Sequence, residues 1–169
     1  MDKNANLKLY DEEYFKKRIP YELKEQRLDR FLRLILAHRP LSVLDIGCGN
    51  GFLVGALLKK GINACGLDFS EYAGREIEGN FFIQADATKP LPFEDKTFDI
   101  VFSADFFEHI NEQSIDSVLS EMKRVGKKVM AAIGYKPEKP YHLTVHKYAW
   151  WKKKLPDVEI LNKTYGKFY

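Results

Sequence analysis

The pattern of apolar and polar residues predicts helices and strands that alternate along the 169-residue chain. Residues 21–38 place Leu, Phe and Ile side chains on one helical face, with Pro20 near the expected helix start and Pro40 beyond its end. Short apolar runs between turn residues predict strands. We expect strands over 42–47, 63–69, 80–87, 97–105, 127–134 and 157–169, and further helices over 51–60, 112–125 and 146–155.

Two residues mark the ends of these helices. Gly61 is expected to end the helix over 51–60, and Asn111 is expected to cap the helix over 112–125. The alternation of strand and helix implies a parallel sheet with helices on both sides and right-handed crossovers. Ligands of such sheets bind outside the carboxyl ends of the strands, so the residues that follow the strands are the first candidates for a site.

Length and composition limit the possible classes of protein. With 169 residues, 45% of them hydrophobic, the chain can form one domain with its own core. Cys48 and Cys65 are too few for a disulfide framework and lack metal-ligand spacing, which favours a reducing compartment. No apolar run approaches the roughly 18 residues of a membrane span, and the N-terminus has no signal-like segment. We expect a cytoplasmic protein without a membrane span.

The net charge of +3 is unevenly distributed along the chain. Residues 1–122 hold 15 Lys and Arg against 21 Asp and Glu, whereas residues 123–169 hold 12 against 3. A basic C-terminal part could attract an anionic partner such as a nucleic acid. The simpler interpretation, which we favour, is a lysine-rich surface that faces water.

The most informative segment is VLDIGCGNG at residues 43–51, where glycines directly follow an apolar run. Such a turn exposes backbone N–H groups and lets a ligand approach the main chain. A dinucleotide site would have a third glycine where Phe52 stands, which weakens that interpretation. Asp45 would repel a phosphate but suits a cation.

This segment and three later ones resemble the class I S-adenosylmethionine-dependent methyltransferases, especially the type 11 group. The later segments are LDFS with Asp68, QADA with Asp86, and LPFEDKTFDIVFSADFFEHI, so the resemblance covers about residues 40–155. It implies a single-domain, Rossmann-like α/β fold with a mostly parallel central sheet, helices on both faces and a shortened C-terminal end. Within residues 1–169 it implies an N-terminal helical cover (1–39), a cofactor-binding core (40–134) and an acceptor-side segment with the last strand (135–169).

The resemblance also implies S-adenosylmethionine as the cofactor. Asp45 would favour the cationic methionyl end, Asp68 would accept both ribose hydroxyls, and Phe69 could pack on the adenine. Asp86 would accept from the adenine amine, and the N–H of Ala87 would donate to the ring. The cofactor-binding candidates are Asp45, Gly47, Cys48, Gly49, Gly51, Asp68, Phe69, Asp86, Ala87, Ala104 and Tyr14. Alternatively, Asp45 caps local backbone N–H groups and Asp86 opens the next turn.

Methyl transfer from a sulfonium is an in-line displacement, so the protein mainly aligns the reactants and excludes water. We expect an enzyme that methylates an oxygen or nitrogen of an unidentified small molecule. His109, His142 and His146 are the candidate bases, although for His109 we favour a loop-fixing role. Of the adjacent Trp150 and Trp151, one is expected in the core and the other in a pocket wall.

Three alternatives remain open. Asp105, Glu108 and His109 resemble the ExxEH pattern by which some O-methyltransferases, including RNA 2′-O-methyltransferases, hold a divalent metal such as Mg²⁺, which a further histidine completes in the RNA enzymes. A second alternative is a non-catalytic protein that binds S-adenosylmethionine or its demethylated product. The third is a nucleic-acid acceptor. We expect a monomer or homodimer in which Tyr10, Tyr14 and Tyr21 cover the cofactor or a dimer contact does so.

Overall fold

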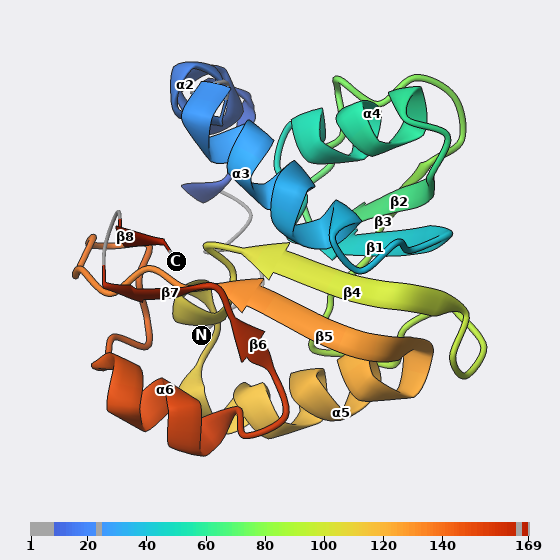
Figure 1. Cartoon of the computed structure of the whole chain (residues 1–169). Helices are drawn as coiled ribbons and strands as arrows, with labels where there is room; N and C mark the ends of the chain where they lie inside the picture. Colours follow the sequence, from blue (N-terminus) through green and yellow to red (C-terminus); the bar gives the residue numbers. More distant parts are fainter. Residues whose placement is uncertain (1–8, 23–24, 165–166, 169) are drawn as a thin grey trace. The chain divides into compact units, whose positions relative to one another are not determined.

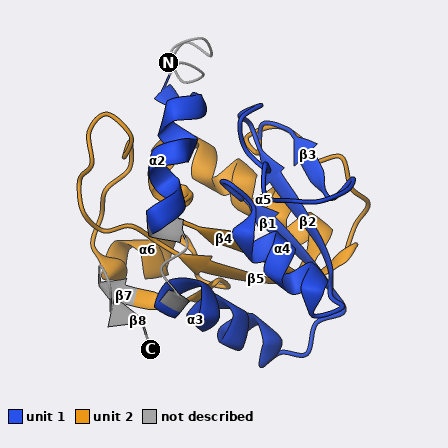
Figure 2. Cartoon of the chain, turned by 90° about the horizontal axis from the view of Figure 1, so that it is seen from above, with its two compact units in different colours: residues 1–86 blue, residues 87–169 orange. Residues whose placement is uncertain are grey.

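The computed structural model describes residues 9–22, 25–164 and 167–168 (Figure 1). The chain divides into two compact units, residues 1–86 and 87–169 (Figure 2). Each unit contains three strands of a parallel sheet, in the order β3-β2-β1 in the first unit and β4-β5-β6 in the second. This sheet confirms the predicted α/β, Rossmann-like fold class. The finer division at residues 39 and 134 stays a prediction.

The first unit consists of helices and three parallel strands. Its helices are α2 (Glu12–Glu22), α3 (Glu25–Leu36) and α4 (Phe52–Lys59), and its strands are β1 (Ser42–Ile46), β2 (Asn63–Asp68) and β3 (Phe82–Gln84). The strand order is β3-β2-β1, with Leu44 opposite Cys65 and Leu67 opposite Ile83. Helix α4 packs against β2 and α3. Four of the five residues of β1 are buried, as expected for a strand inside a parallel sheet.

The second unit also consists of helices and three parallel strands, but these are connected differently. Its strands β4 (Phe98–Ala104), β5 (Gly126–Ala132) and β6 (Glu159–Ile160) are parallel, in the order β4-β5-β6. Helix α5 (Ile115–Val125) packs on β4 and β5 through a stripe of buried apolar residues, and α6 (Tyr148–Lys154) follows later. Two 3₁₀ turns, η1 (Phe107–His109) and η2 (Glu112–Ser114), follow β4. The chain ends in an antiparallel pair, β7 (Asn162–Thr164) and β8 (Lys167–Phe168).

The N-terminal part differs from its prediction. The single helix expected over 21–38 is α3, and a separate helix, α2, precedes it. Pro20 therefore lies inside the last turn of α2 rather than at a helix start. Asp11 determines the start of α2, because its Oδ1 accepts a hydrogen bond from the N–H of Tyr14 (2.9 Å) in the manner of an N-cap. The side chain of Tyr21 lies outside the described part of the chain.

Three predicted boundaries were also wrong. The side chain of Asn111 makes no capping hydrogen bond, and a 3₁₀ turn over residues 112–114 precedes the helix. Strand β3 covers only 82–84 instead of 80–87, so Asp86 lies two residues beyond the strand that it was expected to end. The last segment is not one strand, because it splits into β6 and the β7–β8 pair.

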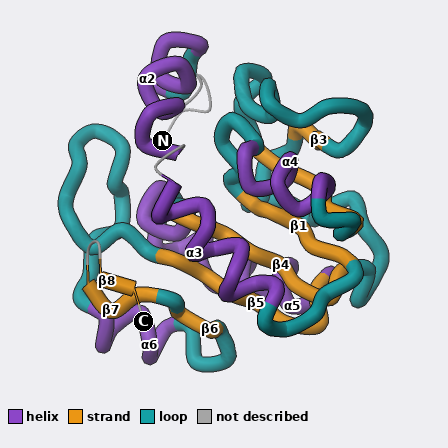
Figure 3. The backbone as a smooth tube through the Cα atoms, turned by 45° about the horizontal axis from the view of Figure 1, so that its top comes forward, coloured by secondary structure: helices purple, strands orange, loops and turns teal. Residues whose placement is uncertain are grey.

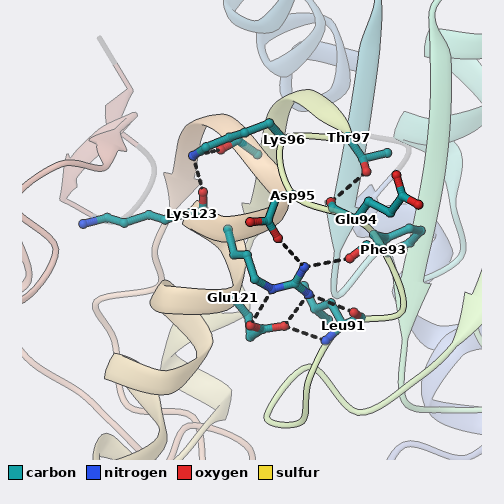
Figure 4. A network of polar contacts seen from close by, with 10 residues as sticks. Leu91, Phe93, Glu94, Asp95, Lys96, Thr97, Glu121 and Lys123 are labelled. Carbon is teal, nitrogen blue, oxygen red and sulfur yellow. Dashed lines mark hydrogen bonds and ion pairs between the residues drawn. The ribbon is translucent and has the colours of Figure 1, made fainter.

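Arg124 fixes the proline-marked loop that leads into β4. Figure 4 labels the four residues that Arg124 contacts there, which are Leu91, Phe93, Asp95 and Glu121. Its guanidinium donates to the carbonyl oxygens of Leu91 (3.0 Å) and Phe93 (2.7 Å) and to the carboxylates of Asp95 (3.1 Å) and Glu121 (2.8 Å). Glu121 in turn accepts from the N–H of Leu91 (2.7 Å). The hydrogen bond from Arg124, followed by that from Leu91, lowers the pKa of Glu121 to about 2. The loop is thus tied to α5 by a charged cluster.

The structure also accounts for the charge asymmetry of the sequence. Counted over the second unit, residues 87–169 hold 14 Lys and Arg against 11 Asp and Glu, because the acidic residues that neutralise the basic C-terminal part precede it in sequence. Ion pairs join Lys123 to Asp157 (2.6 Å), Lys127 to Asp99 (2.8 Å) and Lys154 to Asp116 (2.7 Å). This pattern agrees with the interpretation of these lysines as an ordinary surface. Among the described helices, none combines the length and the apolar character that a membrane crossing requires.

Candidate functional site

The glycine turn after β1 requires glycine for two separate reasons. Gly47, Gly49 and Gly51 all have positive φ angles, of 71°, 57° and 91°. Side chains rarely tolerate this left-handed region of backbone conformation. At Gly51 a Cβ would also lie 2.3 Å from Cγ1 of Ile77, which is closer than atoms can approach. The turn therefore keeps its shape only while these positions lack side chains.

Hydrogen bonds fix the turn against the neighbouring strand. The N–H groups of Gly47 (2.8 Å) and Cys48 (3.2 Å) both donate to the carbonyl oxygen of Leu67 in β2. Asp45, predicted at the cationic end of the cofactor, is buried within β1. Cys48 is also buried, and the turn leads directly into α4. The predicted residues from 45 to 51 thus form one continuous strand-turn-helix segment.

Asp68, the predicted ribose ligand, ends β2 beside this turn. Its Oδ2 accepts from the N–H of Gly49 (3.3 Å), and its Oδ1 accepts from the N–H of Ser70 (3.1 Å). The carboxylate is only 7% exposed, so these two bonds hold it in one orientation. A carboxylate oxygen can accept more than one hydrogen bond, so the geometry is compatible with additional bonds from a diol. The structure brings Asp68 and the glycine turn together.

The aromatic candidates of the first unit form a cluster next to Asp68. The ring of Tyr10 makes edge contacts with the rings of Phe69 (5.1 Å between centroids) and Tyr14 (4.8 Å). Tyr14 also contacts Phe15, which is buried. Such contacts are favourable beyond their buried area. Tyr10 therefore links Phe69 and Tyr14 in one cluster.

The remaining predicted cofactor residues follow β3 and β4. Asp86 is half-buried in the loop after β3, next to Ala85, whose N–H donates to the carbonyl oxygen of Asp68 (2.8 Å). Ala87 is buried, and Ala104 is the last residue of β4. These two alanines belong to the second unit. Their role in cofactor binding stays a prediction, as it does for the other candidates.

In the second unit Glu108 organises the segments that follow β4 and β5. Its buried carboxylate Oε1 accepts from the N–H of Gly134 (2.6 Å), directly after β5. Its carbonyl oxygen accepts from the N–H groups of Leu143 (2.7 Å) and Thr144 (3.0 Å). Figure 3 shows this long connection between β5 and α6 as a loop. Glu108 is thus the residue that fixes the loop, a role that sequence reasoning had favoured for His109.

Two of the three candidate histidines meet at Glu108. The rings of His109 and His142 are in edge contact, with centroids 4.7 Å apart. One nitrogen of each ring and one oxygen of Glu108 all lie within 4.8 Å of one another. Nδ1 of His142 is hydrogen-bonded to the carbonyl oxygen of Lys136. A carbonyl can only accept, so Nδ1 carries the proton, and Nε2 has the lone pair when the ring is neutral.

Asp105 and His146 lie outside this cluster. Asp105, the expected first metal ligand, has a φ of 50° directly after β4 and donates its N–H to Ala132 (2.9 Å). Among the described residues, the group that could hold a metal contains His142 in place of Asp105. His146 instead pairs with Glu112 (3.0 Å) and stacks on Trp150, with ring centroids 3.8 Å apart.

The predicted division of the two tryptophans is confirmed in part. Trp151 is fully buried, whereas Trp150 is only half-buried and contacts His146. The expected pocket wall at Trp150 stays a prediction, because a cavity of about 470 Å³ in the described part of the chain is lined instead by residues 26–36 of α3 and by Lys60. None of the predicted site residues contributes to that cavity.

Sequence reasoning missed three residues that shape these sites. Asn50 was passed over between two glycines, although its buried amide donates to the carbonyl oxygen of Phe15 (3.1 Å). Ser70 was not singled out, although it joins Asp68 to the N-terminal segment. Glu108 was considered only as a metal ligand. A polar residue at each of these positions was visible, but its distant partner was not.

Comparisons with known proteins show the family of this chain. Residues 44–129 match the model of the methyltransferase domain family, which is half of the chain. A wheat (Triticum aestivum) protein, phosphoethanolamine N-methyltransferase 1, is 27% identical over 110 residues, which are 60% of this chain and 22% of that protein. The ubiquinone biosynthesis O-methyltransferase of Mesorhizobium japonicum is 34% identical over 99 residues, 52% of this chain and 39% of that one. The chain thus spans less than half the length of these relatives.

Solved structures show the same fold. A SAM-dependent methyltransferase from Archaeoglobus fulgidus has a TM-score of 0.57 and 30% identity, over 68% of this chain and 54% of that one. Another from Aquifex aeolicus has a TM-score of 0.62 and 22% identity, over 87% of both chains, which shows similarity of fold alone. The chain therefore belongs to the methyltransferase domain family of class I, S-adenosylmethionine-dependent proteins, whose cofactor is S-adenosylmethionine.

Proposed function

We propose that this chain transfers the methyl group of S-adenosylmethionine to an oxygen or nitrogen of a small molecule. The observation that carries the proposal is the buried Asp68 carboxylate, held by Gly49 and Ser70 beside a glycine turn. Asp68 would bind the ribose, and the turn would let the methionyl chain pass along the backbone. Asp45 would favour the cationic end of the same ligand. The family match supports this assignment of the donor.

The nature of the acceptor is inferred from the relatives. Two of them are named for an N-methylation of phosphoethanolamine and an O-methylation in ubiquinone biosynthesis. A small-molecule acceptor is consistent with the second unit, where ion pairs neutralise several of the lysines that a nucleic acid would need. A nucleic-acid acceptor has less support.

His142 is the residue that we assign to proton removal. Its Nδ1–H donates to the carbonyl oxygen of Lys136, so Nε2 of the neutral ring can accept a proton. The edge contact with His109 limits rotation of the ring. A hydroxyl acceptor needs such a base at the moment of attack, whereas a neutral amine needs it less. His109 would hold the ring of His142 in place. We do not assign proton removal to His146, which pairs with Glu112 and stacks on Trp150.

Glu108, His109 and His142 favour a second candidate function, a divalent-metal-assisted O-methyltransferase. The cluster offers one carboxylate and two imidazoles, which suit Zn²⁺, Mn²⁺ or Fe²⁺ better than Mg²⁺. The hydrogen bond from Nδ1 of His142 to Lys136 is the kind of contact that orients a metal-binding imidazole. Such an ion, when bound, lowers the pKa of an attacking hydroxyl.

Three measurements separate these candidates. Titration calorimetry with S-adenosylmethionine and S-adenosylhomocysteine tests the donor. If neither ligand binds with micromolar affinity, the proposal is wrong. Incubation with methyl-labelled S-adenosylmethionine and an extract of small metabolites tests catalysis, since binding without label transfer indicates a non-catalytic protein. The metal-assisted function is excluded if activity survives dialysis against a chelator and if His142→Asn binds Mn²⁺ with unchanged affinity. The cytoplasmic location and the oligomeric state stay predictions.

A further inference from the structure

Residues 10–15 are attached to both loops of the first unit that carry predicted donor-binding residues. In the glycine turn, Asn50 Nδ2 donates to the carbonyl oxygen of Phe15 (3.1 Å). In the loop after β2, Ser70 Oγ donates to the carbonyl oxygen of Tyr10 (2.7 Å). Asn50 is 2% exposed and Ser70 is 1% exposed. Because water cannot readily replace a buried partner, these bonds are hard to substitute once formed.

Ser70 connects this attachment directly to Asp68. Its backbone N–H donates to Asp68 Oδ1 (3.1 Å), while its hydroxyl donates to Tyr10 and accepts from the N–H of Tyr72 (3.2 Å). A hydroxyl has one proton to donate, so the bond to Tyr10 fixes its orientation. The position of the loop that holds Asp68 therefore depends on whether the N-terminal segment is docked.

Contacts at the surface extend the same attachment. Arg75, in the segment after β2, pairs with Glu12 in the first turn of α2 (2.9 Å). This pair lowers the pKa of Glu12 but is exposed, so it contributes little to stability. Buried Phe15 and the rings of Tyr10 and Phe69 supply the apolar part. The two buried hydrogen bonds, from Asn50 and from Ser70, are the directional contacts of this attachment. The surface ion pair and the apolar contacts accompany them.

We propose that Asn50 and Ser70 are positioning residues that couple docking of α2 and its preceding turn to donor binding. The inference rests on the proposed function, because it takes the glycine turn and Asp68 as the donor site. Coupling of binding free energies is reciprocal: a docked α2 raises the affinity for S-adenosylmethionine, and bound S-adenosylmethionine favours docking of α2 by the same factor. Neither Asn50 nor Ser70 needs to touch the donor for this effect.

The first test uses the unmodified protein. Hydrogen exchange of the amides of residues 12–18 is compared with and without saturating S-adenosylmethionine, whose binding is measured separately by calorimetry. We expect slower exchange in these amides when the donor is bound. Donor binding with unchanged exchange would overturn the coupling and leave the proposed function intact. If no donor binds, the proposed function fails, and the coupling fails with it.

The second test isolates the hydroxyl of Ser70. Ser70→Ala keeps the N–H that donates to Asp68 and removes only the hydroxyl bonds, whereas Ser70→Thr retains a hydroxyl. Loss of one buried hydrogen bond changes an equilibrium constant by about tenfold. We therefore expect the rate constant of donor release to rise about tenfold in Ser70→Ala. Faster exchange of α2 amides should accompany it, and Ser70→Thr should restore both values.

Asn50→Ala provides an independent variant at the other attachment. The matched controls are Ser120→Ala and Asn63→Ala, since both side chains are exposed. Thermal unfolding identifies a variant that fails to fold. If one of the two variants fails to fold, the rate of donor release in the other one decides the test. Release rates in folded Ser70→Ala and Asn50→Ala that equal those of the controls would overturn the assignment.

Discussion

Glu108 and Gly134 are joined by a hydrogen bond of 2.6 Å from the glycine N–H to the buried carboxylate. This bond connects the turn after β4 to the end of β5, across 26 positions of sequence. The carbonyl oxygen of Glu108 holds the start of the segment that contains Thr144. One residue thus sets the relative placement of the two segments that carry His109 and His142.

Glu108→Ala should destabilise the protein by about 1–3 kcal/mol, because the buried N–H of Gly134 loses its acceptor. Glu108→Gln keeps an acceptor oxygen at nearly the same place and should lose much less. Denaturant unfolding of the two variants gives the comparison. Equal losses in both would show that the charge, and not the hydrogen bond, stabilises this region.

Gly134→Ala should be destabilising by about 1–3 kcal/mol, because its Cβ would lie 2.2 Å from Glu108 Oε1 and 3.1 Å from His142 Cε1. The added methyl must displace both side chains. Gly55→Ala is the matched control, since Gly55 lies within α4 and its Cβ would meet only the carbonyl oxygen of Glu76, at 3.4 Å. Chemical denaturation should rank Gly55→Ala as neutral or stabilising, and the opposite ranking would contradict the packing described here.

Asp68→Ala should weaken binding of S-adenosylmethionine by about 1–3 kcal/mol, the usual loss for hydrogen bonds to a charged group. Titration calorimetry measures the change. Asp99→Ala is the control, because Asp99 pairs with Lys127 on the surface of the other unit. Unchanged affinity in a folded Asp68→Ala would remove Asp68 from the donor site.

Glu121 should stabilise the protein above pH 4.3, its approximate unfolded pKa, and progressively less below that pH. The sign follows because Arg124 lowers the folded pKa to about 2, so the unfolded chain binds the proton first as the pH falls. Glu121→Gln should therefore be less stable than the parent by about 1–2 kcal/mol at pH 6, after allowance for solvent screening. Unfolding curves at pH 6 and pH 2.5 should show the difference shrinking.

Glu94→Gln is the control for the pH experiment. Glu94 is exposed in the same loop, so its replacement should change stability little at either pH. A deficit of Glu121→Gln that stays the same between pH 6 and pH 2.5 would contradict the proposed effect of Arg124.

The strands and helices with strong apolar periodicity could be predicted from sequence. Strand β1, helix α4 and strand β4 match their expected ranges to within a residue or two, because buried runs and glycine signals are local. Helix α2 was missed because its sequence, EEYFKKRIPYE, is polar and contains Pro20. Its contacts are also distant in sequence: the carbonyl oxygen of Phe15 accepts a hydrogen bond from Asn50, which lies 35 positions away.

In the candidate site, too, sequence predicted the local features but not the contacts between residues that are distant in sequence. The glycine turn was predicted from its place directly after an expected strand, and Asp68 was predicted from the family resemblance of the segment LDFS. The cluster of Glu108, His109 and His142 required knowledge of the loop after β5, which brings His142 back to a turn more than 30 positions earlier in sequence. Asp105, three positions before Glu108, was the expected member, but the described group contains His142 instead, and Asp105 has a left-handed φ of 50°.

The surface ion pairs of the second unit affect how the protein should behave toward charged matrices. Each paired lysine and carboxylate, such as Lys154 with Asp116, acts at a distance as a dipole, whose field declines faster than that of a single charge. Retention on a cation exchanger should therefore fall short of what the 12 Lys and Arg against 3 Asp and Glu of residues 123–169 suggest. Acidification that protonates the carboxylates would expose the lysine charges and strengthen that retention.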